Sequence, residues 1–501
     1  MSLYNQYEIN YIKNNIDAIN NHVKTITNKL FKPTFTDKQQ IKDIIIKYIQ
    51  KNKRKIYGGY AINELIIIKN NRDAIYSHID IPDIDFYSPD PNTDIINLCN
   101  LLHDVGFQHV TGREAKHKYT YSIFVEYDLY CDITYVPKNI YNKIPFKIIN
   151  NIYYVHPNFI NIDYLKIITD PFSYWRLEKC IDRINLLHKY YPITHIKESI
   201  YIGETDNDEN IKKSINIICD FLINKQDIIV IGFYAYNYFL LKSGLKKIKF
   251  VQIPFIEFIS KNFVSDAKTL LDILKIDFDK ITHIEFHPFF IYFGNRVEIY
   301  LNDELICIIY DYDKRCLMYQ NVKYIDFNNS QYIEINNKSV NIGTLTLTLL
   351  FANVNILKYK INDDDLKQLY ISMCSHLIQM KDIFFKINKL NLMDKHIFTD
   401  FVTDFIGPNI NPDHEILIKY EKRRLKNKPS IYIYDPVKNK KDEKQKNFFF
   451  PNISGNQITN IKYQKLSEQH IEDDSDNDNE ENQDIEFDDN QNQDIVHDDN
   501  E

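Results

Sequence analysis

The chain has few of the features that mark zinc modules, disulfide scaffolds or membrane proteins. Glycine is scarce, at 11 of 501 residues, and tryptophan occurs once. The seven cysteines are scattered, and no two of them form a C-x-x-C pair. This spacing argues against a zinc module and a disulfide framework, and it favours reduced thiols inside a cell. The N-terminus is polar and no apolar run reaches about 18 residues, so we expect neither a signal peptide nor a membrane span.

Basic residues are missing from the end of the chain. Residues 467–501 hold 16 acids and no Lys or Arg, and they are rich in Asn and Gln. The rest of the chain carries all 61 basic residues and the other 53 acids, a net charge of +8. A basic body can hold a polyanion, and an acidic tail of this composition is predicted to be disordered. The lysine-rich segments 419–428 and 438–446 could therefore hold an RNA backbone.

Two short motifs lie close together in the first hundred residues. Gly58 and Gly59 follow a short apolar run and precede a helical pattern, and glycines at such a turn expose backbone N–H groups to phosphate. Asp83 and Asp85 follow in the alternating run 81–88, where residues two apart share one face of a strand. Because paired carboxylates suit Mg²⁺ or Mn²⁺, the stretch predicts a site for a triphosphate and a divalent metal.

Two-metal phosphoryl transfer needs one further acid on a neighbouring strand. Residues 118–136 are predicted to form a β-hairpin, and its second strand contains Asp128 and Asp132. We favour Asp132 because its neighbours in the sequence are more apolar, and a carboxylate in apolar surroundings is costly unless it has a function there. Asp128 has the same parity and could take its place, and both acids could simply face water.

Several basic and aromatic residues are open to two interpretations. Arg176, Lys179 and Arg183 repeat at helix spacing, so they could line a nucleotide or RNA groove, or pair with neighbouring acids. The basic run 51–55 could meet phosphate or be a solvated loop. We expect Trp175 to lie in the core rather than to stack on a base.

The sequence repeats itself at a separation of about 172–176 residues. Residues 228–240 resemble 55–65, and residues 253–260 match 81–88 at five of eight positions. In the second copy Phe233 replaces Gly59, Phe255 replaces Asp83, and Ile308 replaces Asp132; Glu257 is the remaining acid, opposite Asp85. One carboxylate cannot hold two metals, so we expect the second copy to be structural or RNA-holding.

The stretches I-Y-G-G-Y-A-I-N-E-L, P-D-I-D-F-Y-S and D-L-Y-C-D-I-T-Y-V-P carry a family resemblance. They resemble the nucleotidyltransferase superfamily of the DNA polymerase beta type, and most of all the poly(A) polymerase catalytic subunits of poxviruses and other large DNA viruses. The resemblance implies an enzyme of mRNA polyadenylation, which adds AMP from ATP to an RNA 3′ end without a template. Gly-Gly stands where many members have Gly-Ser, and the gap from Gly59 to Asp83 is longer than in most.

In this interpretation the catalytic and metal-binding residues are Asp83, Asp85 and Asp132, holding two Mg²⁺ or Mn²⁺ ions. The ATP-binding residues are Gly58, Gly59, Arg176 and Lys179. The expected fold is α/β (α+β), with two tandem nucleotidyltransferase-like domains, the second degenerate. The expected divisions are a helical segment at 1–50, a catalytic domain at 51–200, a degenerate domain with C-terminal helices at 211–400, a basic extension at 401–466 and a disordered acidic tail at 467–501.

The expected partners are the RNA 3′ end and ATP, with no membrane. A homodimer, or a separate processivity partner like that of the poxvirus enzymes, is also possible. The expected location is intracellular, in the virion and host cytoplasm. Two alternatives stay open: a nucleotidyltransferase with another substrate, such as a uridylyl- or tRNA-adding enzyme, and a non-catalytic RNA-binding or processivity protein.

Overall fold

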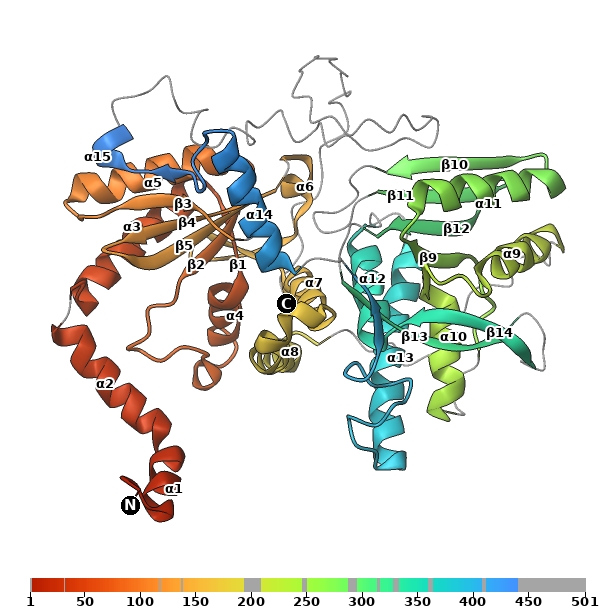
Figure 1. Ribbon diagram of the computed structural model, residues 1–501, viewed down its shortest axis with the longest axis horizontal. Coiled ribbons are helices and arrows are strands. Elements are labelled where there is room, and N and C mark those ends of the chain that lie inside the picture. The colour runs from red at the N-terminus through yellow and green to blue at the C-terminus, as the bar shows by residue number, and fades with distance from the viewer. Residues whose placement is uncertain are drawn as a thin grey trace. The chain divides into compact units, whose positions relative to one another are not determined.

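A computed structural model shows two mixed β-sheets with helices packed against them (Figure 1). It describes residues 2–30, 32–116, 119–136, 138–192, 209–245, 250–286, 295–312, 316–327, 333–358, 364–407 and 411–439. The predicted acidic tail at 467–501 lies outside these residues, as does most of the second lysine-rich segment. Within the described parts of the chain, each sheet has eight strands.

The first sheet has the strand order β16-β3-β4-β5-β2-β1-β7-β6. Its strands are β1 (Lys55–Tyr57), β2 (Ile84–Ser88), β3 (Thr111–Glu114), β4 (Thr120–Val125), β5 (Asp128–Tyr135), β6 (Phe146–Ile149), β7 (Ile152–Val155) and β16 (Ile433–Tyr434). The helices of this half are α3 (Phe35–Lys51), α4 (Gly58–Ile67), α5 (Pro91–Val105), α6 (Lys138–Lys143), α7 (Pro157–Ile168) and α8 (Leu177–Tyr190), with 3₁₀ turns η1 (Asn71–Asp73) and η2 (Pro171–Arg176).

The second sheet has the order β10-β11-β12-β9-β8-β14-β13-β15. Its strands are β8 (Ile228–Ile231), β9 (Ile256–Ser260), β10 (Ile281–Phe286), β11 (Arg296–Leu301), β12 (Glu304–Asp311), β13 (Leu317–Asp326), β14 (Ile333–Gly343) and β15 (Asp404–Ile406). The helices are α9 (Glu209–Leu222), α10 (Gly232–Ser243), α11 (Phe263–Asp277), α12 (Leu345–Lys358) and α13 (Asp364–Asn388).

The two sheets share one topology over seven strands each. Replacing β1 to β7 by β8 to β14 turns the first order into the second, and every neighbouring pair keeps its parallel or antiparallel sense. A buried hydrogen bond is also repeated, since Ser88 donates to Asp94 as Ser260 donates to Asp266. The prediction of two tandem domains of one fold is confirmed.

The C-terminal part of the chain adds one strand to each sheet. β15 pairs with β13 of the second sheet, and β16 pairs with β3 of the first. Between them, α14 (Pro412–Leu425) is tied to the first sheet because Lys419 and Arg423 both donate to Glu114. The short helix α15 (Pro436–Asn439) follows β16 and packs near α5.

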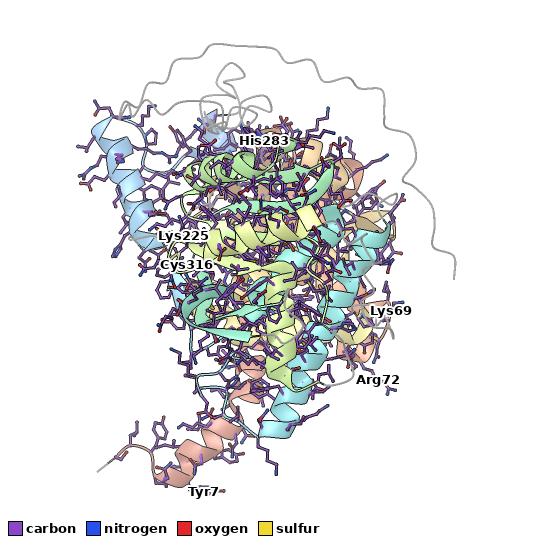
Figure 2. All side chains as sticks on the ribbon, turned by 90° about the vertical axis from the view of Figure 1, so that its right-hand side faces the viewer. Tyr7, Lys69, Arg72, Lys225, His283 and Cys316 are labelled. Atoms are coloured by element: carbon purple, nitrogen blue, oxygen red, sulfur yellow. The ribbon has the colours of Figure 1, made fainter. Side chains whose placement is uncertain are left out.

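The N-terminal helices α1 (Gln6–Asn14) and α2 (Ile16–Leu30) bury none of their residues. Their apolar side chains face solvent, and Tyr7 projects from α1 with 78% of its surface exposed (Figure 2). Nowhere in the described parts of the chain is a helix both long and apolar enough to cross a membrane.

Candidate active site

The turn from β1 into α4 requires glycine at its first position. Gly58 begins α4 with φ +71°, in the left-handed region that side chains disfavour. A Cβ atom there would overlap the Asp85 carboxylate and lie 3.2 Å from its Cγ. β1 and β2 are antiparallel neighbours, with Tyr57 opposite Asp85, so the sheet itself holds this acid against the helix N-terminus.

Two of the three predicted acids lie side by side on neighbouring central strands of the first sheet. β2 and β5 are parallel, and Asp85 lies directly opposite Asp132 in their register. Ser122 on β4 donates a 2.6 Å hydrogen bond to Asp132. Asp83 stands two residues before Asp85 and is exposed. Asp128 is also exposed and pairs instead with Lys38, at 3.1 Å.

The acids repel one another. Burial raises the pKa of Asp85 well above its ordinary value, and the charges of Asp83 and Asp132 raise it further. Burial likewise raises the pKa of Asp132, against the hydrogen bond from Ser122, and Asp83 adds to the rise. Such a cluster is stabilised by a bound cation.

The donor set, three carboxylates, suits Mg²⁺ or Mn²⁺. As positioned, however, no three His, Cys, Asp or Glu side chains in the described parts of the chain form a ready metal cluster. The fit of these carboxylates to the implied ions rests on two other observations. All three are oxygen ligands, and their mutual repulsion is relieved by a bound cation.

Three cations of α8 and the turn before it lie near these acids. The pKa of Lys179 is lowered by burial and then by the charge of Arg183, and Asp83 acts in the opposite direction. The positive charge of Arg176 opposes the rise in the pKa of both Asp85 and Asp132. Among the described residues, no carboxylate lies within ion-pairing distance of any of the three cations. The alternative of a salt-bridged helix face is therefore not what the structure shows.

Arg183 is held by groups that the sequence did not reveal. Its guanidinium donates to the phenol oxygens of Tyr76, at 2.9 Å, and Tyr164, at 3.2 Å. A Cβ atom on Gly59 would lie 2.6 Å from one nitrogen of this guanidinium. Gly59 is thus small because Arg183 sits against the glycine turn. Tyr76 lies in the link between α4 and β2, where no periodic pattern signals a role.

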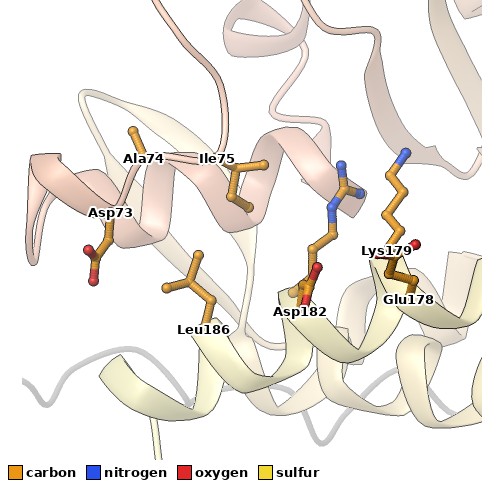
Figure 3. A pocket seen from close by; sticks show the side chains of 8 residues that line it. Asp73, Ala74, Ile75, Glu178, Lys179, Asp182 and Leu186 are labelled. Carbon is orange, nitrogen blue, oxygen red and sulfur yellow. The ribbon is translucent and has the colours of Figure 1, made fainter. Parts of the chain in front are cut away.

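A pocket of about 410 Å³ opens between η1 and α8 (Figure 3). Asp73 lies at one end of it and Lys179 at the other, with Ile75 and Leu186 contributing apolar surface. This volume is typical of small-molecule sites. The pocket adjoins the cations that face the acids.

Two sequence expectations near the site are wrong. Arg54 does not meet phosphate, because its guanidinium binds the buried carboxylate of Asp94 at 2.8 and 2.9 Å. Lys55 is buried and donates to the carbonyls of Tyr141 and Ile144. Trp175 is not in the core, since 68% of its surface is exposed.

The second copy keeps the glycine turn but only one of the three acids. Gly232 has φ +66° and lies against Glu257, which is buried and accepts hydrogen bonds from Tyr310 and Asn355. Phe233 packs edge-on against Phe255 with ring centroids 5.4 Å apart, filling the space of Gly59 and Asp83. In the register of β12 and β9, Ile308 lies opposite Glu257. At this point the second copy is a buried core that keeps one hydrogen-bonded acid.

Comparison with known proteins gives the class of protein first. Residues 43–174 match the family "Poly(A) polymerase catalytic subunit". Residues 185–468, more than half of the chain, match the family "APMV, Putative poly(A) polymerase, catalytic subunit, C-terminal". The two matches correspond to the two copies of the fold, and both describe poly(A) polymerases.

Individual relatives agree with this class. The chain is 30% identical over 495 residues to the "Putative poly(A) polymerase catalytic subunit" of Acanthamoeba polyphaga mimivirus, covering 92% of this chain and 83% of that one. A protein of the same name from African swine fever virus (strain Badajoz 1971 Vero-adapted) is 30% identical over 171 residues, 32% of this chain and 36% of its own. The crystal structure of the Megavirus polyadenylate synthase superposes with a TM-score of 0.76 at 28% identity, covering 90% of this chain and 89% of the other.

The chain belongs to the family of viral poly(A) polymerase catalytic subunits. The family and the enzyme class that the sequence motifs implied, polynucleotide adenylyltransferase, are confirmed. Members of this family use a nucleotide substrate and a divalent metal.

Proposed function

We propose that this chain adds AMP from ATP to RNA 3′ ends by two-metal phosphoryl transfer. The observation that carries the proposal is the placement of Asp85 directly opposite Asp132 on parallel strands, beside the glycine turn. This arrangement puts carboxylate ligands beside the backbone N–H groups of a helix N-terminus. A triphosphate with its metals needs both.

The phosphate-binding roles follow from charge and position. The N–H groups of the first turn of α4, at Gly58 and Gly59, would hold the β- and γ-phosphates. Arg176 and Lys179 would neutralise the same triphosphate, because no carboxylate of the described residues engages either cation. Holding the triphosphate in line with the 3′-hydroxyl supplies most of the catalysis in phosphoryl transfer.

The three carboxylates would bind the two metal ions. Asp83 and Asp85 would each bind two ions, and Asp132 would bind the ion nearer the RNA 3′ end. When bound, Mg²⁺ or Mn²⁺ lowers the pKa of the attacking hydroxyl and neutralises the leaving pyrophosphate. The hydrogen bond from Ser122 fixes the orientation of Asp132 for this role.

The other assignments extend the same proposal. The catalytic domain is placed at 51–200, and the second copy, at 211–400, would be structural or hold RNA. The exposed apolar side chains of α1 and α2 could supply a surface for a homodimer or a processivity partner. The enzyme would act on transcripts in the virion and host cytoplasm.

The site assignment is tested by replacing single acids with their amides. Asp132→Asn and Asp83→Asn should abolish AMP transfer while the far-UV circular dichroism and melting temperature stay those of the native protein. Asp128→Asn is the matched control, since Asp128 is on β5 but pairs with Lys38. Substantial activity in Asp132→Asn, or loss of activity in Asp128→Asn, would contradict the assignment.

The substrate assignment needs a separate assay. Purified protein is incubated with an RNA primer, Mg²⁺ or Mn²⁺, and each nucleoside triphosphate in turn. A long homopolymer from ATP alone is the expected product. A short addition from CTP or UTP would indicate another nucleotidyltransferase, and no product from any triphosphate would indicate a binding protein.

A further inference from the structure

Two consecutive aromatic rings stand exposed in η2, the turn that also carries Arg176. Tyr174 exposes 77% of its surface and Trp175 exposes 68%, and they are consecutive residues of η2. Two adjacent exposed rings offer apolar surface that a bound ligand can bury, with a gain of about 25 cal/mol per Å². Neither ring has a role in the chemistry proposed above.

The turn that carries the rings is held rigidly. Asp170 caps it by accepting hydrogen bonds from the Phe172 backbone N–H, at 3.0 Å, and from the Ser173 hydroxyl, at 3.1 Å. Pro171 occupies its first position, and α8 continues from its last residue. Rings presented by a fixed turn lose little conformational entropy when a ligand binds.

The turn lies within electrostatic range of the acids. Burial raises the pKa of Asp85 and of Asp132, and the positive charge of Arg176 opposes the rise at both. The guanidinium carbon of Arg176 lies 4.5 Å from the centre of the Trp175 ring. One side chain thus joins the exposed rings to the reaction centre. It also places a cation beside the rings.

We propose that Tyr174 and Trp175 form a stacking platform for the terminal bases of the RNA primer, which presents its 3′-hydroxyl to Asp132. This inference rests on the proposed function and names the site where its polynucleotide substrate is held. Adjacent open rings with a nearby cation are how proteins bind single strands without reading their sequence.

The same rings could in principle stack the base of ATP, but their openness favours RNA. Selecting adenine from other bases requires an enclosed pocket with hydrogen-bonding groups. An exposed pair of rings accepts any base, which suits a primer whose end differs from one transcript to the next. The experiment tests ATP and RNA separately as the source of the stacked base.

Trp175 is the only tryptophan of the chain, so its fluorescence reports on this platform alone. The protein is titrated with oligoadenylate RNA in EDTA, without ATP, using a primer with an intact or an abasic 3′-terminal nucleotide. We expect the intact RNA to quench the emission, and the abasic RNA to bind roughly tenfold more weakly, as stacking of one base predicts. ATP alone should change the emission less than the intact RNA does, because its triphosphate reaches Arg176 beside the ring without stacking on the ring.

A kinetic experiment uses substitutions of the same ring. Trp175→Ala should raise the KM for RNA about fivefold to 150-fold, and the KM for ATP much less, because the ring touches ATP only through Arg176. Trp175→Phe should restore most of the loss. The control is Tyr127→Ala, since Tyr127 is equally exposed, at 69%, in the β4–β5 turn.

Each result decides the matter. RNA that leaves the emission unchanged, a KM for ATP raised in Trp175→Ala as much as the KM for RNA, or an equal loss in Tyr127→Ala would overturn the platform. These failures leave polymerisation by the native protein intact. A native protein that extends no primer would overturn the proposed function instead, and the fluorescence titration would still test stacking.

Discussion

Replacing Gly58 by alanine should inactivate the enzyme without unfolding it. The backbone at this position has φ +71°, and alanine there costs about 1–2 kcal/mol of strain. The new Cβ would also overlap the Asp85 carboxylate, so the carboxylate must move by about 1 Å to reach an ordinary contact distance. A displacement of that size in a catalytic group lowers activity about 100-fold, or about 2.7 kcal/mol in the barrier.

The chain supplies two matched controls for this substitution. Gly244→Ala has the same φ, +71°, with nothing within 4 Å of the new Cβ, so it measures strain alone. Gly232→Ala has φ +66° and places its Cβ 2.8 Å from the Glu257 carboxyl carbon, so it measures strain and collision in the degenerate copy. Both variants should lose stability in urea unfolding and keep their activity per folded molecule.

The assay is primer extension by folded protein at saturating ATP, with folded fraction measured by circular dichroism. The expected order of kcat is native, Gly244→Ala and Gly232→Ala together, then Gly58→Ala far below. A Gly58→Ala enzyme as active as Gly244→Ala would refute the placement of Asp85 in the reaction centre. Equal inactivation of Gly232→Ala would show instead that strain, not the acid, governs activity.

Two further predictions concern the basic run before the glycines. Arg54→Met should lower the free energy of unfolding in urea by about 3–5 kcal/mol, because the Asp94 carboxylate stays buried without its guanidinium partner. The RNA affinity of this variant, measured by filter binding, should equal that of the native protein. A weaker affinity would restore the phosphate-binding interpretation. Burial lowers the pKa of Lys55 to about 8 in the native protein, whereas a free lysine has a pKa of about 10.4. Between about pH 8 and pH 10.4 the unfolded chain therefore binds more protons than the native protein does. The free energy of unfolding should rise with pH across that window, by at most about 1.4 kcal/mol per pH unit. The two carbonyl bonds to its ammonium reduce this slope, and Lys55→Met, measured at pH 7 and 10, should lack it; an equal slope in both proteins would show that the burial of Lys55 is not its cause.

Periodicity and local chemistry were enough to predict the strands and the glycine turn. The alternating run around Asp85 and the hairpin containing Asp132 are signals within a few residues. Their pairing was not readable from periodicity, since β2 and β5 are separated by α5 and two further strands. The expectation that the two acids lie on neighbouring strands came instead from the chemistry, because two-metal phosphoryl transfer needs a further acid there.

What the sequence concealed depends on contacts between distant residues. Arg54 meets an acid 40 residues away, and Arg183 meets Tyr76 across 107 residues. No local pattern distinguishes such a buried cation from one that binds phosphate. Trp175 was misplaced for a different reason: a single tryptophan is usually core, and η2 instead turns the ring outward before α8 begins.

The degenerate copy separates what the fold requires from what the chemistry requires. Gly232 keeps both the positive φ of Gly58 and its contact with an acid, although Glu257 now only accepts hydrogen bonds within a buried core. A glycine at this turn is therefore a backbone requirement of the topology, and its presence alone does not indicate catalysis. The positions that changed are Gly59, Asp83 and Asp132. Gly59 lies against Arg183, and the two acids flank Asp85 in the first copy, so these are the three positions where we expect the proposed chemistry to depend on the side chain.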